Sequence, residues 1–243
     1  MFKTTKALIL REVKYKEADR ILTVLTESDG KQTVKAQGAL RKTSKFGAAT
    51  QVLTFSELTL FGERGRWFVR EGTVLDGFEG LRSDLESLSI AAYLAEVLEA
   101  VSDEDVPNPA VLQLGLNCLY ALSRDLCPKE QVKAVFELRL ACLSGYAPDL
   151  TGCVSCGRTD GPMAFSNSRG GLVCRTCGYG MQPVSPECLA AMRFVVNAPS
   201  RKIFSFSLTG DAAREFAVTS EVYLLNQLER NFSSLDYYKK IKG

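Results

Sequence analysis

Histidine is absent from this sequence of 243 residues. Its absence excludes Ser-His-Asp and Cys-His catalysis, and it excludes every metal site that uses an imidazole ligand. No apolar run approaches the roughly 18 residues of a transmembrane helix, and residues 1–6 include two lysines and no long uncharged stretch. We therefore expect neither a membrane protein nor a secreted one, and we favour a cytoplasmic location.

A strong excess of charge of one sign is also missing, because 30 Lys and Arg face 28 Asp and Glu and leave a net charge of +2. The charges are nevertheless unevenly distributed. Residues 1–80 carry 14 basic and 10 acidic side chains, whereas residues 81–150 carry 5 and 11. This asymmetry indicates that the first block meets a polyanion and that the second does not.

Residues 1–80 have the pattern of a small β domain. Short stretches rich in aliphatic and β-branched residues recur at regular spacing, and Asp29-Gly30 is a strong signal for a tight turn between two of them. About five strands in some 75 residues favour a closed barrel over an open sheet. The acid-free stretch from Gly30 to Ser56 lies within this block.

Residues 81–150 and 181–243 have the pattern of a helical domain. Ser83-Asp84-Leu85-Glu86 is a capping-box sequence, and Asn108-Pro109, Pro128 and Ser185-Pro186 are further helix starts. A last helix is expected over about 211–230. Together with the barrel, these helices predict an α+β protein.

Two C-x2-C pairs in residues 151–180 are the most specific signal. Cys153 and Cys156 form one pair, Cys174 and Cys177 the other, and 17 residues separate the pairs. Two such turns supply the four sulfur ligands of a tetrahedral zinc ion and leave no open position, so we expect one structural zinc per chain in a ribbon. An iron–sulfur cluster or a redox pair are the alternatives. The four other cysteines, in apolar stretches, are expected to be small buried hydrophobic residues: Cys118, Cys127, Cys142 and Cys188.

The basic side chains of the barrel block are candidates for nucleic-acid contacts, because phosphates need point charges along a groove. A solvated charged face is the alternative. Tyr15, Phe46 and Trp67 are candidates for stacking on bases, although Phe46 and Trp67 could equally be core residues. The predicted DNA-binding positions are Lys14, Arg20, Lys31, Lys35, Arg41, Lys42, Lys45 and Arg66.

Several segments resemble one known family. They are Lys-Ala-Leu-Ile-Leu-Arg-Glu-Val from Lys6, Tyr-Lys-Glu-Ala-Asp-Arg-Ile-Leu-Thr-Val-Leu-Thr from Tyr15, Ala-Gln-Gly-Ala-Leu-Arg-Lys-Thr-Ser-Lys-Phe-Gly from Ala36, and Phe-Ser-Glu-Leu-Thr-Leu-Phe-Gly from Phe55. Gly-Leu-Arg-Ser-Asp-Leu from Gly80 and Ala-Tyr-Leu-Ala-Glu from Ala92 continue the likeness. The sequence resembles the bacterial recombination mediator family RecO, in its zinc-bearing form.

The resemblance implies an N-terminal five-stranded OB-fold barrel (residues 1–80), a helical domain (residues 81–150 and 181–243) and an inserted zinc ribbon (residues 151–180). It also implies a protein of DNA recombination and repair that binds single- and double-stranded DNA and anneals complementary strands. The implied partners are RecR, single-strand-binding protein and, indirectly, RecA, and the implied location is the nucleoid. The positions from Lys35 to Lys45 are the best DNA contacts on this basis.

The function that we expect is therefore strand handling without catalysis. One alternative is a zinc-ribbon enzyme acting on nucleic acid, which would need clustered carboxylates, whereas most acidic residues lie on the predicted helices. No Gly-rich loop of the G-x-x-x-x-G-K-Ser/Thr type occurs, which argues against a motor. The other alternative is a scaffold that binds only proteins. The apolar and basic tail at residues 237–242 has no assigned role.

Overall fold

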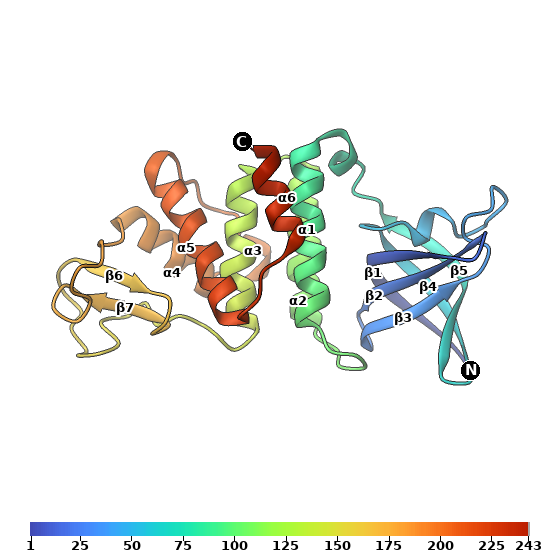
Figure 1. Cartoon of the computed structure of the whole chain (residues 1–243), viewed down its shortest axis with the longest axis horizontal. Helices are drawn as coiled ribbons and strands as arrows, with labels where there is room; N and C mark the ends of the chain where they lie inside the picture. Colours follow the sequence, from blue (N-terminus) through green and yellow to red (C-terminus); the bar gives the residue numbers. More distant parts are fainter. Residues whose placement is uncertain (243) are drawn as a thin grey trace. The chain divides into compact units, whose positions relative to one another are not determined.

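A computed structural model describes residues 1–242. Contacts divide the chain into two compact units, residues 1–124 with the C-terminal segment from Phe232, and residues 125–231. The first unit contains five strands and the second a two-stranded sheet (Figure 1). The finer division into barrel, helical domain and ribbon that the sequence predicts stays a prediction.

The five strands of the first unit form a closed barrel with the order β1-β2-β3-β5-β4. The long first strand closes it, because its N-terminal half pairs with β4 and its C-terminal part pairs with β2. All pairings are antiparallel except that of β3 with β5. This order is that of the OB fold, so the predicted five-stranded barrel is confirmed. The strands are β1 (Phe2–Tyr15), β2 (Asp19–Thr26), β3 (Gly30–Ala36), β4 (Phe55–Glu63) and β5 (Arg66–Asp76).

Alternate residues of each strand fill the barrel, as the two-residue period of a strand requires. The aliphatic residues that point inward are almost completely shielded from solvent, and burial of each stabilises the barrel by roughly 1.5–3 kcal/mol. Phe46 and Trp67 are half-buried and pack against this core. The central members of the core are Ala7, Ile9, Leu22, Val24, Val34, Leu58, Leu60 and Val69.

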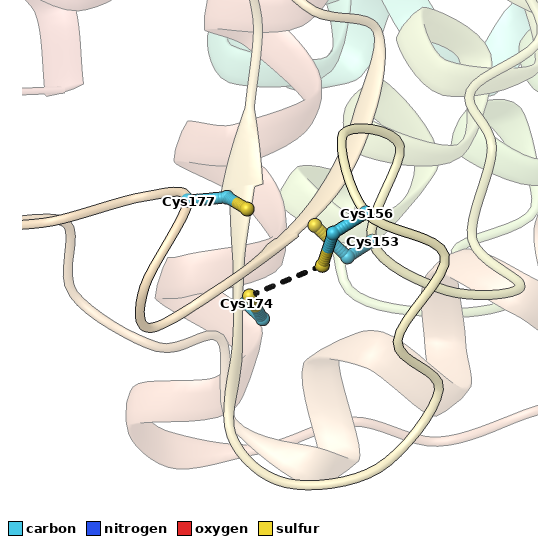
Figure 2. A group of neighbouring side chains, drawn as sticks. All are labelled: Cys153, Cys156, Cys174 and Cys177. Atoms are coloured by element: carbon cyan, nitrogen blue, oxygen red, sulfur yellow. Dashed lines mark hydrogen bonds between the residues drawn. The ribbon is translucent and has the colours of Figure 1, made fainter.

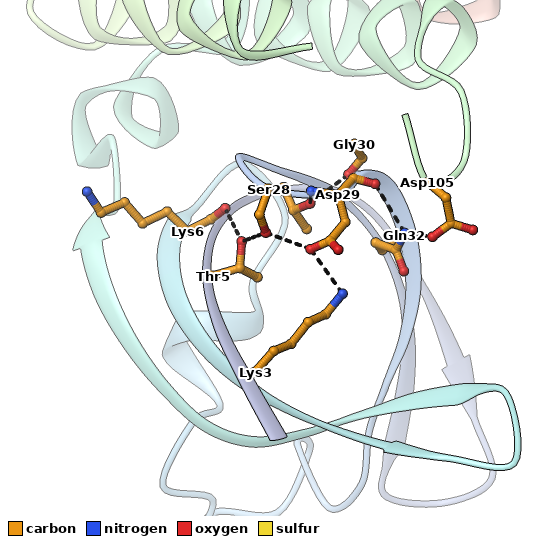
Figure 3. A network of polar contacts seen from close by, with 9 residues as sticks. Lys3, Thr5, Lys6, Ser28, Asp29, Gly30, Gln32 and Asp105 are labelled. Atoms are coloured by element: carbon orange, nitrogen blue, oxygen red, sulfur yellow. Dashed lines mark hydrogen bonds and ion pairs between the residues drawn. The ribbon is translucent and has the colours of Figure 1, made fainter. Parts of the chain in front are cut away.

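The predicted Asp29-Gly30 turn joins β2 to β3, and a network of polar contacts fixes it (Figure 3). Lys3 Nζ lies 3.0 Å from the Asp29 carboxylate, and the Ser28 hydroxyl donates to the same carboxylate at 2.6 Å. The hydrogen bond from Ser28 lowers the pKa of Asp29, with Lys3 contributing in the same direction against burial. Gly30 has a φ of +64°, and a Cβ there would lie 2.0 Å from the Val106 carbonyl oxygen. The turn therefore requires glycine at this position.

Three helices complete the first unit: α1 (Leu85–Val101), α2 (Pro109–Ser123) and α6 (Ser233–Lys242). Asn108 caps α2 as predicted, with its side chain accepting a hydrogen bond from the Val111 amide. The capping residue of α1 is Asp84, not Ser83, because Ser83 ends the short 3-10 helix η2 (Glu79–Ser83). The start of this helix was thus predicted one residue too early.

The C-terminal helix α6 was not predicted, and contacts with α1 hold it in place. Phe232 lies just before α6, and its ring packs edge-on against Tyr93 of α1, with 5.8 Å between the ring centroids. Glu96 of α1 accepts a hydrogen bond from the Ser234 amide at 3.0 Å and another from the Ser234 hydroxyl. Glu96 therefore caps a helix that lies more than 130 residues later in the sequence.

The second unit combines helices with a small ribbon. Helix α3 packs against both α4 and α5. A buried ion cluster joins α3 to α5, because Lys133 Nζ lies 2.7 Å from carboxylate oxygens of both Glu137 and Glu221. None of the helices in residues 1–242 has the length and apolar character needed to cross a membrane. The elements are α3 (Lys129–Leu143), β6 (Met163–Ser166), β7 (Gly171–Cys174), α4 (Pro186–Asn197), η3 (Ser200–Lys202) and α5 (Gly210–Leu228).

Candidate nucleic-acid interface and metal centre

The four cysteines of the ribbon converge on one point (Figure 2). The sulfur atoms of Cys153, Cys156, Cys174 and Cys177 all lie within 4.8 Å of one another, and those of Cys156 and Cys174 are 3.7 Å apart. Zinc–sulfur bonds of about 2.3 Å in a regular tetrahedron place the sulfurs about 3.8 Å apart. The cluster is therefore compatible with one structural metal ion.

The two C-x2-C turns are closed by equivalent backbone hydrogen bonds. In the first, the Gly157 amide donates to the Cys153 carbonyl, and in the second the Gly178 amide donates to the Cys174 carbonyl, each at 2.8 Å. Gly157 has a φ of +76°, a conformation that glycine adopts without strain. Each turn thus brings two thiols to the same side, as the spacing predicts.

Backbone amides favour the thiolate form in this cluster. The N–H group of Cys174 and, more weakly, those of Ser155 and Cys156 lower the pKa of the Cys153 thiol to about 6. The Cys177 amide lowers the pKa of Cys174 in the same way. Hydrogen bonds with Cys156, Cys174 and Cys153 raise the pKa of Cys177 to about 12. Because a metal ion binds thiolates, its binding would release the proton of Cys177.

Arg169 links the two turns from outside the cluster. Its guanidinium donates to the Ser155 hydroxyl at 2.9 Å and to the Cys177 carbonyl at 3.1 Å. Ser155 belongs to the first turn and Cys177 to the second. This arginine therefore fixes the turns relative to each other and places a positive charge beside the sulfur cluster.

A pocket of 410 Å³ opens on the barrel where β3 and β5 meet. These strands pair only through Val34 with Trp67 and Lys35 with Phe68. The residues around it come from the end of β1, from β2 and β3, and from the β4–β5 turn with the start of β5. Its lining combines aromatic, apolar and cationic residues: Tyr15, Ile21, Thr33, Val34, Lys35, Gly65, Arg66 and Trp67. This is the region through which OB folds bind oligonucleotides.

Three of the predicted DNA-binding cations have partners within the first unit. Lys31 donates to the Glu99 carbonyl at 3.0 Å, and Arg20 is largely buried and pairs with Glu12 at 3.2 Å. Lys35 lies 3.0 Å from the Asp19 carboxylate, yet it also lines the pocket. A hydrogen bond from the Gly38 amide, followed by one from Lys35, lowers the pKa of Asp19. Of the predicted DNA-binding cations, Lys31 and Arg20 are therefore the two whose side chains mainly stabilise the first unit.

The other predicted cations stand without a carboxylate partner in residues 1–242. Lys14 ends β1 beside Tyr15, and Arg66 begins β5 in the pocket wall. Arg41 and Lys45 line a second depression, of 240 Å³, in the loop after β3, with Lys42 between them in sequence. Arg70 of β5 lines this depression too. Arg70 was not among the predicted contacts, because a single cation on a strand carries no local signal.

The three candidate stacking residues differ in how much of the ring is available. Trp67 packs against the barrel core, Lys3 Nζ lies 4.0 Å from its ring centroid, and a Cβ at Gly62 would lie 2.8 Å from a ring carbon. Phe46 is also packed against the core. Tyr15 is 41% exposed, with Lys35 Nζ 4.6 Å from its ring centroid. Tyr15 is therefore the best placed of the three.

The remaining four cysteines lie outside the ribbon in the sequence and are not members of its cluster. Cys118 and Cys188 are buried, as expected of small hydrophobic residues, whereas Cys127 and Cys142 are only partly buried. Burial raises the pKa of the Cys188 thiol to about 12, and Glu215 adds to the shift. Burial likewise raises the pKa of the Cys127 thiol to about 11 and raises the pKa of Cys142, so these three thiols are held in the neutral form.

Comparisons with known proteins match nearly the whole length of the chain. The family model described as "Recombination protein O N terminal" matches residues 1–78, and "Recombination protein O C terminal" matches residues 82–236. The DNA repair protein RecO of Acetivibrio thermocellus is 34% identical over 98% of this chain and 96% of its own length. The RecO proteins of Alkaliphilus metalliredigens and Desulforudis audaxviator are 31% and 34% identical, each over 98% of this chain and over 98% and 96% of their own lengths.

Proposed function

This chain belongs to the recombination protein O (RecO) family, and from that premise we propose that it binds single-stranded DNA on its barrel during DNA repair. The observation that carries the proposal is the pocket between β3 and β5. It occupies the OB-fold ligand face, and it offers Tyr15 for stacking and Arg66 for a phosphate. Its 410 Å³ lies within the roughly 300–1,000 Å³ of ligand pockets.

The basic loop after β3 extends the proposed contact along the phosphate backbone. Arg41, Lys42 and Lys45 lie within a stretch of 27 residues, from Gly30 to Ser56, that contains no carboxylate. Cations placed in this way attract any nucleic acid regardless of its sequence. Contacts of this kind serve double-stranded DNA as well, so we propose that both forms bind.

We propose that the protein anneals complementary strands and catalyses no bond change. Base pairing supplies the driving force, and the cations reduce the repulsion between the phosphates of the two strands. Two carboxylates of the barrel, Asp19 and Glu12, are paired with Lys35 and Arg20, so they are poorly disposed to bind a catalytic metal ion. The family resemblance supplies the partners that we propose: RecR, single-strand-binding protein and, through them, RecA at the nucleoid.

For the ribbon we propose one zinc ion held by Cys153, Cys156, Cys174 and Cys177. Four sulfur ligands favour zinc or an iron–sulfur cluster, and two C-x2-C turns at ribbon spacing favour zinc. Zinc would fix the two turns and would leave no position for a substrate. Its role is therefore structural.

The sole tryptophan of the chain lines the pocket, so its fluorescence can test the binding proposal. A titration with oligothymidylate is expected to change the emission of Trp67 and to saturate. Arg66→Ala should weaken binding, whereas Arg214→Ala, which removes an exposed arginine of α5, should not. If the oligothymidylate changes neither the emission of Trp67 in the wild-type protein nor its own fluorescence anisotropy, the result would favour a scaffold that binds only proteins.

Annealing of complementary strands, with and without single-strand-binding protein, tests the finer proposal. A mediator should still anneal strands that are saturated with that protein, and removal of its acidic C-terminal tail should reduce the rate. Annealing that stops once the strand is coated, with RecR present, would contradict the mediator role. Hydrolysis of DNA or ATP by the purified protein would contradict the non-catalytic assignment.

A further inference from the structure

Three phenylalanines form a continuous row across the outer surface of the barrel. Phe2 of β1 is the register partner of Phe61 of β4, and Phe61 is in turn the partner of Phe68 of β5. Their neighbours Leu60 and Val69 point into the core and are buried. Since side chains alternate along a strand, the three phenylalanines face outward. The centroids of the Phe2 and Phe61 rings are 4.9 Å apart.

This row is only partly covered by the rest of the protein. Phe2 is 65% exposed, and Phe61 and Phe68 are half-buried. A contiguous group of partly exposed aromatic residues is a typical mark of a binding surface. The packing of the barrel itself does not require it, because the core lies on the opposite side of these strands.

Arginines surround the row. The Arg70 guanidinium lies 5.0 Å from the centroid of the Phe61 ring, a cation–π arrangement. A depression of 380 Å³ beside the row is lined by Glu63, Arg64, Arg66 and Phe68. Three arginines and one carboxylate thus border the aromatic rings. Positive charge beside exposed aromatic faces is the combination that proteins use for unpaired nucleic-acid strands.

The row is continuous with the pocket between β3 and β5. Phe68 pairs with Phe61 on one side and with Lys35 on the other, and Lys35 lines the pocket. Arg66 lines both the pocket and the depression beside the row. Neighbouring strands lie about 4.8 Å apart, so successive rings lie at distances that consecutive bases of a single strand can reach.

We propose that Phe2, Phe61 and Phe68 are a stacking track for unpaired bases of the strand that enters the pocket, with Arg66 and Arg70 contacting its phosphates. The proposal rests on the function proposed above and extends the DNA site around the β4–β5 turn. In a duplex the faces of the bases are already covered by their neighbours. The track therefore favours single strands over duplex, which the basic loop alone cannot do.

The test compares variants of the track on oligothymidylates of about 4 and about 16 nucleotides, the range of site sizes of OB folds. The double variant Phe2→Ala/Phe68→Ala leaves the central Phe61 in place. Phe2→Tyr/Phe68→Tyr keeps both rings and controls for stacking. Val74→Ala is the matched control, because Val74 is an exposed apolar residue of the same strand, at 39% exposure, outside the row.

The alanine variant is expected to bind the longer oligonucleotide about tenfold more weakly, equivalent to about 1.4 kcal/mol. The tyrosine variant and Val74→Ala should bind like the wild type. The dependence on salt should stay unchanged because no charge is removed. Binding of the short oligonucleotide, the Trp67 emission change and duplex affinity should also be preserved.

Equal affinity of the alanine variant and the wild type for the longer oligonucleotide would overturn the track, while a preserved Trp67 response would leave the proposed function standing. An equal loss on duplex and on single strands would overturn it too. The track would also be overturned if the alanine variant kept its affinity for DNA but lost self-association in sedimentation. The row would then be an interface between two copies of this protein. A wild-type protein that binds no oligonucleotide would instead remove the proposed function itself.

Discussion

Removal of the proposed zinc ion from the ribbon should unfold the two cysteine turns and leave the rest of the second unit folded. The turns, residues 153–158 and 174–181, contain 14 residues. Most of their side chains are exposed or half-buried, including Tyr179 at 95% exposure. Little apolar burial is therefore available to keep them ordered without a metal.

The magnitudes support local unfolding. Ordering the backbone of these residues costs about 1–2 kcal/mol each, hence roughly 14–28 kcal/mol in all. A structural zinc ion contributes about 10–16 kcal/mol in small peptides, which is of the same order. The segment between the turns has other contacts. The ring centroids of Phe165 in β6 and Tyr223 in α5 are 5.2 Å apart, and the Gln227 side chain donates to the Asn167 carbonyl at 3.1 Å. These contacts should survive.

Hydrogen exchange before and after chelation measures this directly. The amides of Gly157 and Gly178 should lose their protection, whereas those of α3 and α5 should keep it. Cys156→Ser should likewise remove the protection of these two amides, and it should lower the zinc content below one per chain. Cys127→Ser replaces a half-buried cysteine outside the cluster and should change neither amide protection nor zinc content. Full protection of both amides after complete removal of metal would refute this reasoning. A purified protein that contains iron, with visible charge-transfer bands, would refute the choice of zinc.

Two predictions concern stability. Gly30→Ala should destabilise the first unit by at least about 2 kcal/mol in urea denaturation, because Ala is strained at this φ and its Cβ would collide with the Val106 carbonyl. A loss of less than about 0.5 kcal/mol would contradict the turn geometry. Lys133→Met should cost about 3–5 kcal/mol, because Glu137 and Glu221 would lose their buried cation. Replacement of all three by apolar residues should restore much of that loss in the same assay, and a triple variant no more stable than Lys133→Met would contradict the account.

The features that the sequence predicted well are those that depend on neighbouring residues. The cysteine turns and the Asp29-Gly30 turn each need only a few adjacent residues, and all are present in the structure. The cap at Asn108 is equally local. The five barrel strands were recognisable because β-branched and aliphatic residues mark each of them. The start of α1 was displaced by one residue because Ser83 and Asp84 are both good capping residues.

The features that were missed depend on residues far apart in the sequence. Helix α6 is short, and its cap comes from Glu96, so nothing within the tail marks its start. The hydrogen bond from Lys31 to the Glu99 carbonyl could not be predicted from the sequence around Lys31, because Glu99 lies 68 residues away. The outward-facing row that includes Phe61 exists only once β1, β4 and β5 are brought into register. Its members looked like ordinary strand residues.

The dependence of single-strand affinity on salt tests the central claim, that the barrel binds DNA, most directly. The logarithm of the affinity should fall linearly with the logarithm of salt concentration, by about 0.7 per phosphate contact. Replacement of Arg41, Lys42 and Lys45 by alanine should flatten that slope by about 2, weaken binding to all sequences alike, and leave the fold intact, while Arg214→Ala changes nothing. An unchanged slope in the triple variant would contradict the account, because it would place the phosphate contacts outside the basic loop.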